Sequence, residues 1–222
     1  MRVSWRFPGA GVRSAPGLAQ VMAWACLALL VTGCAAPMPK IDTSQDAQQA
    51  FEDRARVIEA VDAWRLSARL GLSAEEQHWS AQLHWRFRDG RHVLDLSGPM
   101  GQGGGRLTLD GARPALLETR AGERLRAEDP DALVARLTGR EMPVSGMIYW
   151  VRGLPQPDVA HDIELDSEGR PVRIAQAGWT VEYVDYEEVD GVQLPSRINM
   201  WRDGVELRAR LGGWRLGEDR AS

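Results

Sequence analysis

Residues Trp79–Phe87 read WSAQLHWRF, and their strict alternation of apolar and polar side chains is the clearest structural signal in the chain. Alternate side chains of a β-strand point to opposite faces, so this pattern predicts a strand with one apolar and one polar face. Asp89-Gly90 follows, a pair that favours a two-residue hairpin turn. We therefore expect an antiparallel hairpin whose second strand begins near Val93.

The same period of two recurs along most of the chain. It marks Leu66–Leu72 before the hairpin and a series of short apolar segments after it, separated by Asp-Gly and similar turn-forming pairs. These later strands are expected at residues 93–97, 107–109, 116–117, 163–165, 172–177, 180–184, 197–201 and 205–211. Because no strand alternates with a helix in the manner of βαβ units, the sheet is predicted to be antiparallel.

Three helices are predicted among these strands. Apolar residues at helical spacing favour a helix that Ser44 or Thr43 can cap and that runs to about Trp64. A short helix is expected over residues 129–139, because an Asp-Pro pair begins that segment and a glycine ends it. A third helix is expected from Ser145 to Arg152.

These elements predict a mainly β fold of the α+β class. A sheet with one apolar face must cover that face, and so few helices cannot cover a long flat sheet. We therefore expect a curved antiparallel sheet that is partly closed over the helices. Its apolar interior is either a packed core or a ligand cavity, and the many tryptophans of the chain suit both interpretations.

The N-terminal segment indicates an exported lipoprotein. Arginines precede the apolar run Leu18–Val31, which is shorter than the ~20 residues of a typical transmembrane helix and suits a signal peptide. The run ends at Val31-Thr32-Gly33-Cys34, which looks like a bacterial lipobox whose cysteine accepts diacylglycerol. The alternative is a plain export signal with a chance cysteine.

On this basis we predict three regions: a lipoprotein signal peptide over residues 1–33, a lipidated tether over 34–44 and a single domain over 45–222. Signal removal takes Cys26 away and leaves Cys34 as the lipidated residue, so neither a disulfide nor a thiol nucleophile is expected. The net charge is −4, and no basic stripe carries interleaved aromatic residues, which argues against nucleic-acid binding.

The chain offers no recognisable catalytic chemistry. The motifs of serine hydrolases and zinc proteases are missing, so we expect no enzyme, no metal and no cofactor, and a lipid hydrolase is the weakest hypothesis. His84 and His92 flank the hairpin turn and could face each other as a metal pair, but they lack a third ligand at suitable spacing. Solvated strand residues are the favoured interpretation of these histidines.

The segment Leu96–Gly105 reads LSGPMGQGGG and places one large apolar residue, Met100, in a glycine-rich loop. It joins two predicted strands and opens no helix, so it does not match a phosphate-binding loop. Its length exceeds that of a typical hairpin loop, and long loops are often functional. Met100 either folds back onto the edge of the core or contacts a membrane or a partner.

Beside the lipobox and the leading helix, several motifs follow one another in order over nearly the whole mature chain. They are Val31–Cys34, Gly98–Gly103, Leu137–Gly139, Trp150–Pro155, Gly178-Trp179 with Tyr183 and Tyr186, Leu194-Pro195 and Gly213-Trp214. This ordered set resembles the LolB family of outer-membrane lipoprotein receptors. No single motif is diagnostic, but the set together with a lipobox is fairly specific.

This resemblance implies an incomplete, strongly curved antiparallel barrel with a helical lid over an apolar cavity for lipoprotein acyl chains. The family takes lipoproteins from the soluble periplasmic carrier LolA and places them in the outer membrane. Its membrane-insertion loop corresponds to Gly98, Pro99, Met100 and Gly101, with Met100 where the family usually has leucine. Ala35 after Cys34 implies sorting to the outer membrane, where the lipid holds the protein on the periplasmic face.

Strand parity and the family motifs predict the residues that line the acyl cavity: Trp64, Leu83, Trp85, Leu94, Leu96, Leu107, Trp150 and Trp179. The expected partners are a LolA-type carrier, lipoprotein acyl chains and the outer membrane, and we expect a monomer. The alternative function is a structural or assembly lipoprotein of the outer membrane whose interior is simply a packed core.

Overall fold

The computed structural model describes residues 40–74, 77–99, 103–111, 113–139 and 142–217. Cys34, Met100 and Gly101 therefore lie outside the described residues, as do the predicted signal peptide and most of the tether. No helix in the described ranges is long and apolar enough to cross a membrane.

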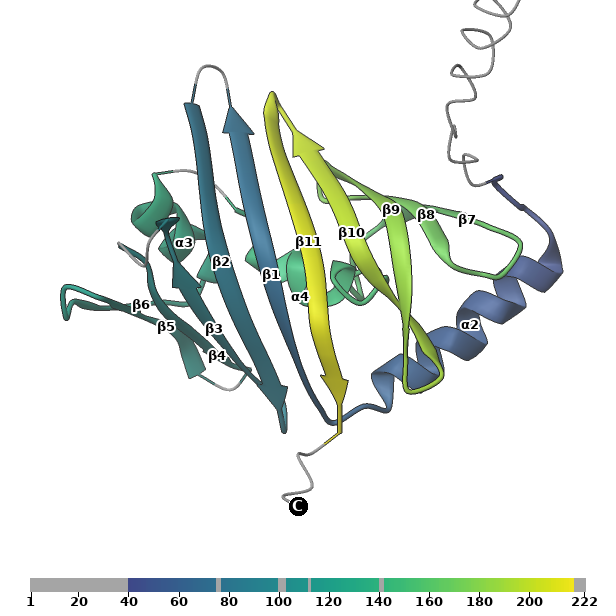
Figure 1. The fold of residues 1–222 in the computed structure, drawn as a ribbon, viewed down its shortest axis with the longest axis horizontal. Coiled ribbons are helices and arrows are strands. Elements are labelled where there is room, and N and C mark those ends of the chain that lie inside the picture. The colour runs from purple at the N-terminus through teal and green to yellow at the C-terminus, as the bar shows by residue number, and fades with distance from the viewer. Residues whose placement is uncertain (1–39, 75–76, 100–102, 112, 140–141, 218–222) are drawn as a thin grey trace, which may run out of the picture. The chain divides into compact units, whose positions relative to one another are not determined.

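One antiparallel sheet of eleven strands dominates the domain (Figure 1). Its spatial order is β6-β5-β4-β3-β2-β1-β11-β10-β9-β8-β7, so β6 and β7 form the two edges and the sheet stays open. The strands are β1 (Ala63–Ala74), β2 (Gln77–Arg88), β3 (Arg91–Ser97), β4 (Gly105–Asp110), β5 (Arg113–Thr119), β6 (Arg124–Ala127), β7 (His161–Leu165), β8 (Pro171–Gln176), β9 (Trp179–Val189), β10 (Val192–Arg202) and β11 (Val205–Leu216). The predicted curved, incomplete antiparallel barrel is confirmed.

The hairpin predicted from WSAQLHWRF is present as β2 and β3. Asp89 and Gly90 both have positive φ, 48° and 76°, as the favoured two-residue hairpin turn requires. Ala81, Leu83 and Trp85 are buried on the inner face, while the polar residues between them are exposed. The alternation in the sequence therefore predicts correctly which face of this strand packs against the core.

The first described helix, α2 (Gln45–Glu59), begins as predicted but ends earlier. Ser44 caps it by accepting a hydrogen bond from the backbone N–H of Ala47 at 3.1 Å. The prediction that the helix reaches Trp64 is wrong, because Trp64 already belongs to β1, where it pairs with Phe87 and Leu216. Pairing on both sides of β1 outweighs the local helical pattern of these residues.

The other two helices are α3 (Pro130–Thr138) and α4 (Val144–Trp150). Asp129 caps α3 by accepting from the N–H of Asp131, and Gly139 ends it with φ 74°, both as predicted. Helix α4 is apolar on most of its surface, which is typical of a helix with no solvent-facing side.

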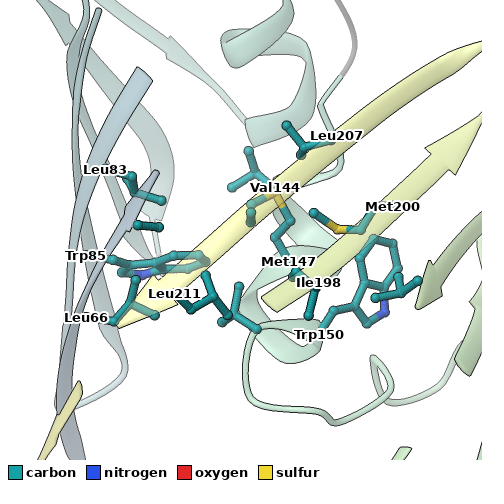
Figure 2. Packing of buried hydrophobic residues seen from close by; sticks show 14 of the residues in the cluster. Leu66, Leu83, Trp85, Val144, Met147, Trp150, Ile198, Met200, Leu207 and Leu211 are labelled. Atoms are coloured by element: carbon teal, nitrogen blue, oxygen red, sulfur yellow. The ribbon is translucent and has the colours of Figure 1, made fainter. Parts of the chain in front are cut away.

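Helix α4 supplies much of the core on the inner side of the curved sheet. Figure 2 shows Val144, Met147 and Trp150 lying between side chains of β1 and β2 and side chains of β10 and β11. Full burial of one large apolar side chain stabilises the folded state by about 1.5–3 kcal/mol. The interior is consequently held together by contacts between α4 and strands that are far apart in the sequence.

Candidate functional site

A small apolar cavity of about 40 Å³ lies between helices α3 and α4 and the inner face of β1–β5. Every lining side chain is apolar, and Gly105 contributes backbone alone. The lining residues are Leu70, Leu83, Leu94, Leu96, Gly105, Leu107, Leu117, Val134, Met142, Val144 and Met147. This volume is well below the roughly 300–1,000 Å³ of a typical ligand pocket, so the space is too small for an acyl chain in this arrangement of α3 and α4.

Four of the predicted acyl-cavity residues lie together on this wall: Leu83, Leu94, Leu96 and Leu107. Sequence reasoning missed the helical side of the cavity, which Val134, Met142, Val144 and Met147 supply. The available signal was the mostly apolar character of residues 142–151, since a helix without a broad polar face must be covered on most sides. Whether any of these residues contacts acyl chains stays a prediction.

The four predicted tryptophans lie elsewhere. Trp64 and Trp85 pack in an aromatic cluster, with ring centroids 5.5 Å apart, and Trp150 is fully buried in the core beside Gln176. Trp179 is buried beneath the guanidinium of Arg202, which lies 5.0 Å from its ring centroid. Large rings fill volume, so in this arrangement they are part of the packed core, and the cavity wall consists of leucine, valine and methionine side chains.

The aromatic cluster also contains Phe87, His92 and Trp214. The indole N–H of Trp85 donates to Nδ1 of His92 at 3.2 Å. The idea that His84 and His92 face each other is wrong, because the hairpin register pairs His92 with Phe87 and His84 with Asp95. Paired residues share a face, so His92 points inward while His84 is exposed outside.

Burial, together with the smaller effect of the nearby positive charge of Arg152, lowers the pKa of His92 to about 4 from its ordinary 6.5. The folded protein therefore holds His92 neutral at a pH where the unfolded chain would bind a proton. As the pH falls from 6.5 to 4, this difference in pKa should lower the free energy of unfolding by at most about 3 kcal/mol.

We accordingly expect His92→Phe to flatten the acid limb of the stability profile. The substitution should cost about 1–3 kcal/mol at pH 7, because the buried N–H of Trp85 loses its acceptor. Urea unfolding of both proteins from pH 4 to pH 8 measures the effect. An equally steep acid limb in the variant would show that another group causes it.

A buried hydrogen-bond network fixes the C-terminal end of α4. Gln176, which is 3% exposed, accepts from the indole N–H of Trp150 at 2.9 Å and from the N–H of Gln156 at 2.8 Å. Its amide donates to the carbonyls of Gln156 and Val159, and the hydroxyl of Tyr183 donates to the carbonyl of Trp150. This end of α4 is therefore tied to β8 and β9.

Arg54 of α2 binds the segment that follows α4. Its guanidinium donates to the carbonyls of Arg152 at 3.0 Å, Gly153 at 3.1 Å and Gln193 at 2.9 Å, and it lies 5.6 Å from the ring centroid of Tyr186. Burial lowers the pKa of Arg54 from its ordinary value. Gly153 has φ +73°, and a Cβ there would lie 2.9 Å from Nη2 of Arg54, which explains the glycine in the Trp150–Pro155 motif.

The base of the loop between β3 and β4 is built by two glycines. A Cβ on Gly104 would lie 2.1 Å from the carbonyl oxygen of Leu96, and one on Gly105 would lie 2.6 Å from that of Glu118. Of the predicted membrane-insertion residues, Gly98 and Pro99 leave the end of β3, with Pro99 exposed. Met100 and Gly101 lie outside the described residues, and the insertion role stays a prediction.

The curved open antiparallel sheet around apolar helices is a fold that this chain shares with solved structures. The chain is similar to a solved LolA superfamily protein from Nitrosomonas europaea, with a TM-score of 0.52 and 11% identity over 78% of this chain and 94% of that one. It is also similar to a putative outer membrane lipoprotein-sorting protein domain from Vibrio parahaemolyticus, with a TM-score of 0.50, 11% identity and the same coverage. These likenesses show the fold alone.

Sequence comparison defines the family more narrowly. The family profile described as outer membrane lipoprotein LolB matches residues 62–214. A relative named outer-membrane lipoprotein LolB from Stutzerimonas stutzeri is 40% identical, in a match that covers 79% of this chain and 85% of the relative. A relative of the same name from Chromohalobacter salexigens is 36% identical, in a match that covers 82% of this chain and 85% of the relative. The chain belongs to the LolB family of outer-membrane lipoproteins, as its ordered motifs predicted.

Proposed function

We propose that this protein is an outer-membrane-anchored receptor that accepts lipoproteins by their acyl chains from a LolA-type periplasmic carrier and inserts them into the outer membrane. The observation that carries the proposal is the wholly apolar cavity between α3, α4 and the sheet, in a chain of the LolB family. Displacing α3 and α4 would turn this filled interior into an acyl-binding surface.

The physical requirement for such a receptor is simple. Each methylene of an acyl chain loses about 0.8 kcal/mol when it passes from an apolar site into water, so a lipoprotein must stay covered during transfer. The sequence contains no nucleotide-binding motif, and transfer would run on a difference in affinity between carrier and receptor. Binding and release, with no covalent chemistry, are then sufficient.

The lipid on Cys34 and the loop around Met100 have different roles, anchoring and delivery. The lipid keeps the receptor at its destination, and the residues between Cys34 and α2 provide the tether. Burial of one methionine contributes at most about 1.5–3 kcal/mol, too little to anchor a protein but enough to bring the loop to the bilayer during delivery.

Probe binding tests the receptor function. A soluble form with Cys34 replaced by alanine should bind a fluorescent fatty acid, and a carrier loaded with lipoprotein should compete with the probe and pass its cargo on. Absence of both probe binding and cargo transfer would contradict the proposal and favour a structural lipoprotein with a packed core. Turnover of an ester lipid would instead indicate a hydrolase.

Replacing Met100 with glutamate should separate acceptance from delivery. A charged tip cannot enter the hydrocarbon, where an ionised carboxylate costs several kcal/mol, whereas the cavity wall is unchanged. Acceptance of lipoprotein from the carrier should therefore persist, while transfer into vesicles falls at least about tenfold. Met100→Leu serves as the control and should deliver normally. Unchanged delivery by Met100→Glu would show that this loop does not insert.

A further inference from the structure

The outer face of the sheet carries arginines directly opposite one another on neighbouring strands. In one row, Arg215 of β11 pairs with Arg65 of β1, which pairs with Arg86 of β2. In a second row, Arg197 of β10 pairs with Arg210 of β11, which pairs with Arg69 of β1. Like charges in directly opposed positions destabilise a sheet, so this arrangement opposes folding.

Carboxylates neutralise one end of each row, at Arg86 and at Arg197. Asp95 pairs with Arg86 at 3.3 Å, and Asp185 pairs with Arg197 at 3.3 Å. Within the described part of the chain, Arg69, Arg210 and Arg215 form no ion pair with a carboxylate, although all three are exposed. A chain whose net charge is −4 thus concentrates positive charge on one face.

Two further features lie on or beside this face. An open groove of about 510 Å³ occurs where β1, β2 and β3 meet at one end of the sheet, and Arg65, Arg86, Arg88 and Arg91 contribute to its lining together with Asp89 and Asp110. Trp201 of β10, in the same outward alternation as Arg197, is 40% exposed. Figure 1 looks onto this face, with β2, β1, β11 and β10 side by side in front of α4.

We propose that this outer face, which we call the arginine face (Arg65, Arg69, Arg86, Arg197, Arg210 and Arg215), docks the domain on an anionic phospholipid surface. The inference rests on the membrane-anchored location proposed above. Guanidinium groups bind phosphate oxygens in a bidentate manner, and Arg69, Arg210 and Arg215 have no carboxylate partner among the described residues. A bilayer containing anionic lipids supplies phosphates over the whole width of the face.

The exposed tryptophan favours a bilayer as the occupant. Indole rings prefer the headgroup region, where their apolar body and polar N–H are both accommodated. A broad array spread over four strands suits a surface with many mobile phosphates, because each arginine can find a partner without a fixed geometry. Positive side chains near an anionic membrane each strengthen binding by about fivefold, and salt screens the attraction.

Arginine footprinting tests the docking on the lipid-anchored protein itself. The protein is placed in phosphatidylcholine vesicles or in vesicles that also contain phosphatidylglycerol, an arginine-specific dicarbonyl reagent is added, and the modification rate of each arginine is measured by mass spectrometry. We expect Arg69, Arg210 and Arg215 to react at least about threefold more slowly in the anionic vesicles, with the protection lost at high salt. Arg56 and Arg124, with side chains 71% and 72% exposed, are internal controls whose rates should not change.

The double variant Arg69→Gln, Arg210→Gln provides an independent test. It should abolish the protection of Arg215 in anionic vesicles and also raise the midpoint of urea unfolding, because it removes opposed like charges. Equal reactivity of the face in both kinds of vesicle would overturn the proposal. Protection by a purified LolA-type carrier alone would also overturn it and identify the face as a protein-docking surface. Neither result would test whether the protein accepts acyl chains. The vesicle comparison contains no carrier and no lipoprotein, and the experiment with carrier alone measures only contact between the two proteins.

Discussion

Arg54→Ala is expected to lower the free energy of unfolding by about 3–5 kcal/mol. The substitution leaves the carbonyls of Arg152, Gly153 and Gln193 without their donor, and a buried unsatisfied acceptor costs about 1–3 kcal/mol. Removal of a buried cation, together with water entering the space left behind, should offset part of this loss. The net effect remains large because Arg54 joins α2, β10 and the segment after α4 at a single point.

Urea unfolding monitored by tryptophan fluorescence measures this loss. Arg56→Ala is the matched control, because Arg56 lies on the same helix and its contacts with Asp53 and with the carbonyl of Glu52 are exposed. Its removal should change stability by less than about 0.5 kcal/mol. Arg54→Lys should recover only part of the loss, since one ammonium cannot reproduce the planar fork of a guanidinium. A loss below about 1 kcal/mol for Arg54→Ala would mean that water replaces the guanidinium at all three carbonyls.

Leu96→Trp is expected to reduce the affinity for a fluorescent fatty acid by more than about tenfold. Leu96 lines the cavity from β3, on the sheet wall that would stay in place if α3 and α4 moved. An indole at this position occupies space that an acyl chain would need. Exclusion of two methylenes costs about 1.6 kcal/mol, which corresponds to slightly more than a tenfold loss of affinity.

The fold should tolerate this substitution, because Leu96 is only partly buried near the end of its strand. Val184→Trp is the control: Val184 is 40% exposed on the outer face of β9, and its replacement should leave probe affinity unchanged. Urea unfolding of both variants checks that they are folded. Normal probe binding by Leu96→Trp would place the acyl site away from the cavity between α3, α4 and β1–β5.

Local patterns predicted the elements well where a single strand or turn carried the information. The alternation in Trp79–Phe87 identified the inner face of β2, and Asp89-Gly90 identified its turn. Asp129 and Gly139 marked both ends of α3. In each case the physical cause acts within a few residues, through backbone dihedral preferences or through the requirement to bury one face of a strand.

The same reasoning was wrong or incomplete where distant segments decide the outcome. The end of α2 depends on β1 pairing with β11, more than a hundred residues away in the chain. The inward position of His92 has a local cause, because the register of the hairpin pairs it with Phe87. The helical side of the cavity depends on how α3 and α4 pack against the sheet. The arginine rows likewise exist only because β1, β2, β10 and β11 are neighbours.

Sequence patterns alone were enough for the strand parity, the turns, the helix caps, the family and the prediction of a lipidated Cys34. The packing of distant segments sets which apolar residues border the cavity, how small that cavity is beside α3 and α4, and which arginines lie opposite one another. The difference lies in the range of the forces concerned. Dihedral preferences and side-chain alternation act along the chain, whereas packing volume, hydrogen bonds to carbonyls and charge repulsion depend on which distant segments the fold brings together.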